Sequence, residues 1–149
     1  MKRLLIFTVF AFLSYYGLAQ IMTPVKWEFE IKQLSSHTYE LIVKADIQKP
    51  WHLYGQYFEK GGPVQLVFDF EKNNNYELIG NTVESPKPHI VKDEIFGIDV
   101  QYFSEAAVFT QKIKISGETE IKLNVEGQVC NDDTGICIMV SGEHTFTLK

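Results

Sequence analysis

Apolar and polar residues alternate one by one along much of this chain. In the segment YELIVKADI (39–47), every second residue is apolar, and these residues would share one face of a strand: Tyr39, Leu41, Val43, Ala45 and Ile47. EIKLNVEGQV (120–129) alternates in the same way with Ile121, Leu123, Val125 and Val129, while Gly127 interrupts the row. WEFEI (27–31) and VQLVFDF (64–70) repeat the pattern with Trp27, Phe29 and Ile31, and with Leu66, Phe68 and Phe70. Because successive side chains of a β-strand point to opposite faces of the sheet, this period predicts strands with one buried face.

Turn-forming residues separate these alternating segments, in the runs QLSSH, KGGP, EKNNN, ESPKP and ISGE. About eight short strands are expected, and no segment after the N-terminal region has a helical period. The chain is therefore predicted to be all-β, an immunoglobulin-like β-sandwich, with a closed barrel as the alternative.

The longest irregular segment is expected between residues 81 and 97. Pro86 and Pro88 cannot donate backbone hydrogen bonds, which excludes this segment from pairing as an interior strand. Long loops in compact domains are often functional, so the segment is a candidate for function.

The N-terminal residues have the pattern of a secretory signal peptide. Lys2 and Arg3 precede an apolar run over residues 4–13, and the small residues Gly17 and Ala19 follow at a cleavage position. The apolar run is short for a membrane span, although a single N-terminal anchor helix is the alternative. We therefore predict a signal peptide at 1–19, one mature domain at 20–149, and an exported protein.

The charge balance of the chain is acidic. Removal of Lys2 and Arg3 with the signal peptide takes the formal net charge from −5 to −7. An acidic surface disfavours nucleic acids and anionic membranes as partners. Export also places the two cysteines in an oxidising compartment, where nearby thiols usually pair.

The two cysteines, Cys130 and Cys137, lie in the sequence VCNDDTGICIMV. The flanking segments KLNVEGQVC and CIMVSGEHTFTL read as two strands of a hairpin, connected by the turn formers of NDDTGI. The cysteines are therefore expected at the two strand ends, close enough to bridge. A disulfide here closes a ring of about eight residues and contributes about 2.5 kcal/mol in the loop-entropy account. Spacing alone leaves open whether such a bond is structural or redox-active.

The residues around the cysteines disfavour a self-activated thiol. Asp132 and Asp133 lie between them, and the loop contains no Lys, Arg or His. Neighbouring carboxylates disfavour a thiolate, so a thioredoxin-type nucleophile is not expected. A disulfide that is attacked by the thiolate of a partner remains possible, because exchange also depends on the attacking thiol and on access.

Other kinds of site have little support in the sequence. No metal and no cofactor are expected, because the four histidines are far apart in the sequence and form no ligand pattern. They are His37, His52, His89 and His144. No serine lies in a nucleophile-elbow pattern, and there is no glycine-rich phosphate loop. Trp27 and Trp51 could form a sugar-binding platform, but they are better explained as strand and core residues.

Three segments together resemble a known family. KPWHLYGQ (49–56), KDEIFGIDVQYF (92–103) and VEGQVCNDDTGICIMV (125–140) resemble, in order and spacing, the N-terminal periplasmic domain of the DsbD family of thiol:disulfide interchange proteins. The resemblance covers nearly the whole mature chain. It implies an immunoglobulin-like fold with a redox-active cysteine pair at its end, covered by a cap loop that a partner displaces.

By position, the resemblance makes Cys130 and Cys137 the redox pair. The cap loop would consist of Asp93, Glu94, Ile95, Phe96 and Gly97, and the residues lining the site would be His52 and Tyr54. The implied partners are thioredoxin-like proteins and disulfide isomerases, with a separate membrane electron carrier, in the periplasm or another exported location.

The sequence departs from the family pattern at four points, one of which is Ile95 at the position of the cap's leading aromatic residue, with Phe96 following one residue later. The loop between the cysteines is longer than is common, Ile138 and Met139 follow the second cysteine where a proline pair is frequent, and the family's membrane and thioredoxin-like domains are not in this sequence. Two functions are therefore carried forward. One is a stand-alone module that passes electrons through the cysteine pair, and the other is a non-catalytic interaction module of the same fold with a structural disulfide.

Overall fold

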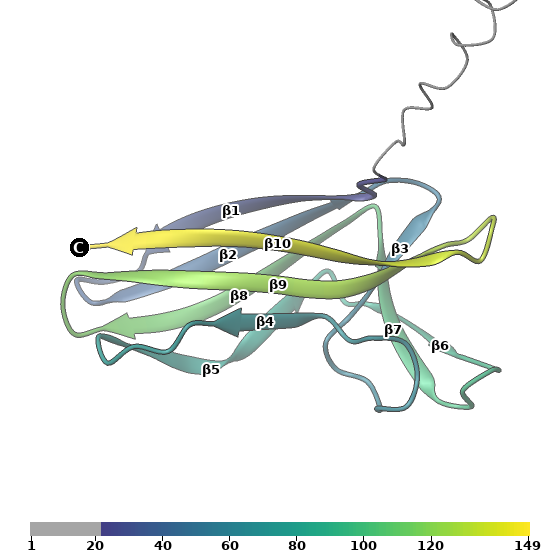
Figure 1. The fold of residues 1–149 in the computed structure, drawn as a ribbon. Helices are drawn as coiled ribbons and strands as arrows, with labels where there is room; N and C mark the ends of the chain where they lie inside the picture. Colours follow the sequence, from purple (N-terminus) through teal and green to yellow (C-terminus); the bar gives the residue numbers. More distant parts are fainter. Residues whose placement is uncertain (1–21) are drawn as a thin grey trace, which may run out of the picture.

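The computed structural model describes residues 22–149, so the predicted signal peptide lies outside the described residues. These residues form ten strands and contain no helix, and accordingly no helix among them is long and apolar enough to cross a membrane. Two sheets pack face to face as a sandwich (Figure 1). The all-β sandwich predicted from the sequence is confirmed, with ten strands instead of about eight.

Every strand pairing in the two sheets is antiparallel. The four-stranded sheet contains, in spatial order, β1 (Val25–Gln33), β2 (Thr38–Ile47), β8 (Ala106–Ile115) and β5 (Tyr76–Ser85). The six-stranded sheet contains, in spatial order, β10 (Cys137–Leu148), β9 (Thr119–Asn131), β3 (Trp51–Tyr54), β7 (Asp99–Ser104) and β6 (His89–Lys92). The sixth strand, β4 (Val67–Phe70), also pairs with β9.

The core lies between the two sheets and is formed by the predicted alternating faces. All five apolar residues of the 39–47 segment are buried, and so are the four of the 121–129 segment. The interruption at Gly127 has a steric reason, because a Cβ there would lie 2.8 Å from Cδ1 of Leu66. The missing side chain makes room for this leucine in the core.

Residues 27–31 form a strand, as predicted, but their apolar side chains are less buried than expected. Trp27 and Phe29 are only half-buried on β1, and Ile31 is exposed. Trp27 lies against Gly142 of β10, and the ring of Phe29 stacks on His144 at 4.8 Å between centroids. Because β1 is an edge strand, its far end has fewer neighbours to cover it.

The prediction of a long irregular segment at 81–97 is wrong. Residues up to Ser85 belong to β5, and residues 89–92 form β6. Pro86 and Pro88 fall between the two strands, where the chain crosses from one sheet to the other, and both strands lie at sheet edges. The proline argument against an interior strand therefore holds. The strands escaped prediction because their side chains are mostly exposed on both faces and do not alternate.

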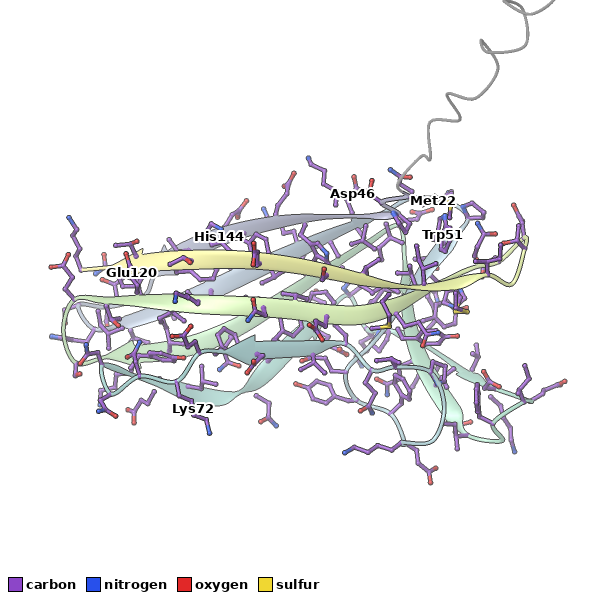
Figure 2. The ribbon with its side chains drawn as sticks, in the orientation of Figure 1. Met22, Asp46, Trp51, Lys72, Glu120 and His144 are labelled. Carbon is purple, nitrogen blue, oxygen red and sulfur yellow. A yellow bond between two sulfur atoms is a disulfide. The ribbon has the colours of Figure 1, made fainter. Side chains whose placement is uncertain are left out.

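The turn between β9 and β10 and the turn between β6 and β7 project from the same end of the sandwich, opposite the C-terminus (Figure 1). Figure 2 shows Trp51, the first residue of β3, at this end, while Glu120 and Lys72 lie toward the other end. Residues 50–54, 93–97 and 130–137 are thereby gathered at one end of the fold.

Candidate functional site

A disulfide joins Cys130 and Cys137 at the end of the β9–β10 hairpin. The two cysteines are direct partners in the strand register, and their Cα atoms lie 4.1 Å apart. The sequence-based expectation of a hairpin with a bridge between its strand ends is confirmed. The described residues contain no free cysteine, so any thiol chemistry among them must begin with the opening of this disulfide.

The connecting turn is organised by its first residue. The Asn131 side-chain oxygen accepts hydrogen bonds from the backbone N–H groups of Asp133 and Thr134, at 3.0 and 2.9 Å. The Gly135 N–H donates to the Asn131 carbonyl, and Gly135 has a φ of +69°, a conformation that favours glycine. The loop of six residues is thus an ordered turn that presents the disulfide at its base.

The two sulfur-bearing residues have different surroundings. Cys130 is only 6% exposed and packs with Tyr54 and Val100 in a small apolar cluster. Cys137 is exposed. Because thiol–disulfide exchange requires access to the sulfur that is attacked, the asymmetry favours attack at Cys137 and departure of Cys130.

His52 lies beside the disulfide on the neighbouring strand β3. It is the register partner of Cys130, and its Nδ1 lies 2.7 Å from Oδ1 of Asp132. The Asp132 N–H also donates to the carbonyl of Pro50 at 2.8 Å. The loop itself contains no basic residue, but the fold places His52, which is 80 positions away in the sequence, beside Asp132 of the loop.

Tyr54 lies on the same strand and is buried against Cys130. Burial raises the pKa of the Tyr54 phenol, and the nearby charges of Asp93 and Asp132 and the Tyr102 phenol raise it further. The phenol therefore stays protonated at neutral pH. The two residues that the resemblance placed at the site, His52 and Tyr54, are in contact, with ring centroids 5.1 Å apart.

Sequence reasoning missed the remaining aromatic residues around the site. Tyr102 on β7 lies 4.8 Å from the His52 ring and 5.3 Å from His89, and Phe58 lies 6.1 Å from Tyr54, all between centroids. The pairing of β3 with β7, which sets Tyr54 opposite Tyr102, brings these rings together. The alternation of Val100, Tyr102 and Ser104 indicates a strand at these residues, but it does not indicate that this strand pairs with β3.

Residues 93–97, expected to form a cap loop, make up the turn between β6 and β7. Oδ1 of Asp93 accepts hydrogen bonds from the N–H groups of Ile95 and Phe96, and the Gly97 N–H donates to the Asp93 carbonyl. Gly97 has a φ of +72°. Glu94 is exposed, as are the side chains of Ile95 and Phe96, at 88% and 48%. The segment is an ordered turn that holds two apolar side chains toward solvent.

The turn rests on the connection between β3 and β4. A Cβ at Gly62 would lie 2.8 Å from Cδ1 of Ile98 and 3.6 Å from Cδ2 of Phe96. The absence of a side chain at Gly62 thus allows the turn to approach this connection closely.

Within the described residues the cysteine pair has no metal-binding cluster beside it, and it lies apart from the hollow at β4 and β5. Among residues 22–149, no group of three or more His, Cys, Asp or Glu side chains is placed to hold a metal ion. A hollow of 520 Å³ lies between β4 and β5, lined in part by Phe68, Phe70 and Tyr76, and none of its lining residues belongs to the cysteine hairpin.

Comparisons with known proteins agree with this geometry. A family model described as "Thiol:disulfide interchange protein DsbD, N-terminal" matches residues 19–149. The N-terminal periplasmic domain of ScsB from Proteus mirabilis has a similar structure, with a TM-score of 0.60 and 13% sequence identity over 83% of this chain. This chain spans 46% of the ScsB chain, which is less than half of its length.

A second similar structure is the DsbD N-terminal domain of Neisseria meningitidis, described as being in the reduced form. The TM-score is 0.56 and the identity 18%, over 85% of this chain and 90% of the other. At these identities the structural likeness establishes the immunoglobulin-like fold. A sequence comparison with curated proteins gives no match.

Proposed function

This chain belongs to the family of N-terminal domains of the thiol:disulfide interchange protein DsbD, and we propose that it exchanges its Cys130–Cys137 disulfide with thioredoxin-like proteins. The observation that carries the proposal is the asymmetry of the bond, with Cys137 exposed and Cys130 buried at the end of the sandwich. An exposed sulfur is open to attack, while the buried one stays in place to re-form the bond.

The exchange is a sequence of two displacements. A thiolate of the partner attacks Sγ of Cys137, the bond to Cys130 breaks, and Cys130 leaves with the electron pair as a thiolate. The second thiolate of the partner then attacks the mixed disulfide and releases Cys137. Two electrons and two protons pass from the partner dithiol to this domain, which becomes the dithiol while the partner becomes the disulfide. A second partner with an oxidised pair reverses these steps and takes the electrons on.

The partners follow from the same premise. We expect a thioredoxin-like or disulfide-isomerase protein on one side of the exchange and a separate membrane electron carrier on the other. The description of the Neisseria meningitidis domain as being in the reduced form supports a pair that accepts electrons in that relative. The two similar structures come from DsbD and from a periplasmic domain of ScsB, which supports an exported protein. The segment 1–19 is proposed as the signal peptide that is removed on export.

The measurement that tests this function is the reduction potential of the pair in the purified domain. Structural disulfides lie below about −300 mV, and exchanging ones lie higher.

The turn at 93–97 is proposed to move over the exposed Cys137 as a displaceable cap, a position different from the one described above, in which Phe96 lies against the β3–β4 connection. Removing the ring with Phe96→Ala is expected to speed reduction of the disulfide by dithiothreitol about threefold, because a small thiol then meets less apolar cover. The measurement is the rate at which free thiols appear in the oxidised domain, followed by alkylation and mass spectrometry.

Ile95→Ala is the matched control for the cap, since Ile95 is the neighbouring apolar residue of the same turn and points almost fully into solvent. This variant is expected to react at the wild-type rate. Equal rates for Phe96→Ala and wild type would remove the cap from this account while leaving the exchange itself in place.

A further inference from the structure

His52 and Cys130 are neighbours on one face of the six-stranded sheet. They are direct partners in the antiparallel register of β3 and β9. Side chains of directly opposed residues point to the same face, with Cβ atoms about 4.5–5.5 Å apart. An imidazole therefore lies next to the sulfur that leaves when Cys137 is attacked.

Three contacts fix the His52 ring. The carboxylate of Asp132 can only accept a hydrogen bond, so the 2.7 Å contact requires that Nδ1–H of His52 donates. The ring also packs against Tyr54 and Tyr102, with centroids 5.1 and 4.8 Å away, and the side chain is only 14% exposed. Because Nδ1 is committed to Asp132, the second proton of the cationic ring resides on Nε2.

The leaving sulfur needs such a neighbour. Cys130 is buried with Tyr54 and Val100, and a negative charge in an apolar cluster is penalised. Asp132, two residues along the chain, adds like-charge repulsion. A cation on the adjacent strand offsets both effects at the moment when the electron pair moves onto Sγ of Cys130.

We propose that protonated His52, held by Asp132, stabilises the negative charge that develops on Cys130 during thiol–disulfide exchange. The inference rests on the proposed function and names a residue that sets the rate of that exchange. The bond between the two cysteines breaks, Cys130 takes its electron pair, the partner sulfur bonds to Cys137, and the Cys130 thiolate is afterwards protonated from water. His52 keeps its proton and acts by its charge.

Ionisable groups from several elements face His52 or pack against its neighbours. Asp132 approaches from the β9–β10 turn, Tyr54 from β3 itself, and Tyr102 from β7. Asp93, from the β6–β7 turn, acts on Tyr54, and the ring of His89 of β6 lies tilted against that of Tyr102, with centroids 5.3 Å apart. Since histidine changes its charge near neutral pH, the proposal predicts an exchange rate that depends on pH even after the attacking thiol has been accounted for.

The test is the rate of reduction of the oxidised domain by dithiothreitol between pH 5.5 and 8.5, divided by the concentration of dithiothreitol thiolate. In the wild type this rate constant should fall about tenfold from the acid to the alkaline end, because a positive charge on a neighbouring side chain favours the leaving thiolate by about one pKa unit or more. In His52→Gln it should be independent of pH and about tenfold lower than wild type at pH 5.5.

Two further variants keep the test decisive. His52→Tyr retains an aromatic ring between Tyr54 and Tyr102 but carries no positive charge, so it should behave as His52→Gln even if the glutamine variant folds poorly. His89→Gln removes the other histidine that contacts Tyr102 and should keep the wild-type profile.

A pH-dependent profile that persists in the two His52 variants, or a flat profile in the wild type, overturns the role of His52. Either result leaves the exchange function standing, provided that the wild-type pair is readily reduced. A wild-type pair that resists thiols as strongly as every variant contradicts the proposed function itself, so the two failures are distinguishable.

Discussion

Replacing Cys130 by serine should turn the domain into a trap for its partner, whereas replacing Cys137 should abolish both exchange and trapping. In Cys130→Ser the exposed Cys137 thiol remains and can form a mixed disulfide that no second thiol of this chain resolves. In Cys137→Ser the remaining thiol belongs to Cys130 and is buried against Tyr54 and Val100. Each variant is incubated with a thioredoxin-like protein whose second cysteine is replaced by serine and whose first cysteine carries a thionitrobenzoate disulfide. Attack by the variant's thiol then releases the small thiolate, no partner thiol can reverse the new bond, and a non-reducing gel shows which variant forms the covalent complex.

Alkylation supplies the quantitative form of this prediction. The thiol of Cys130→Ser should react with iodoacetamide at least about tenfold faster than that of Cys137→Ser, because the buried thiol of Cys130 is much less accessible to the reagent. The double serine variant is the control for labelling elsewhere. Equal labelling of the two single variants, or trapping by Cys137→Ser, contradicts attack at Cys137.

Replacing Phe109 by alanine should remove about 3–5 kcal/mol from the free energy of unfolding. Phe109 of β8 is fully buried between the sheets, where its ring lies 5.0 Å from Phe68 and 5.5 Å from Phe103 between centroids. The truncated side chain leaves a cavity that the two neighbouring rings fill only in part. Urea denaturation followed by tryptophan fluorescence measures the loss.

Lys112→Ala on the same strand is the matched control, because Lys112 is exposed. Its effect is expected to stay within about 0.5 kcal/mol. A loss below about 1 kcal/mol for Phe109→Ala would show that the core does not lie where the two sheets meet around this ring.

The sequence predicts the central strands well because burial and period act together there. In β2 and β9 one face packs on the opposite sheet and the other faces solvent. Apolar and polar residues therefore alternate along 39–47 and 121–129, and this order is visible in the sequence. The cysteine hairpin was predictable for a local reason, since its strands and its turn are adjacent in the chain. β5 and β6 were not, because an edge strand that is exposed on both faces needs no alternation.

The contacts of the candidate site could not be predicted from local sequence patterns. The bond between His52 and Asp132 joins residues 80 positions apart, and the contact of His52 with Tyr102 depends on the pairing of β3 with β7. Local patterns contain no information about either pairing. The resemblance of WHLY (51–54) and DEIFG (93–97) to a family placed these segments at the site, whereas the hydrogen bond and the burial difference between the cysteines required coordinates.

The reduction potential of the Cys130–Cys137 pair shows whether the pair exchanges electrons with partners. The purified mature domain is equilibrated with glutathione and dithiothreitol buffers, and its oxidised fraction is determined by alkylation and mass spectrometry. A pair that exchanges with partners should have a potential above about −250 mV, in the range of exchangeable disulfides. A potential well below about −300 mV would make the bond structural and the domain an interaction module of the same fold.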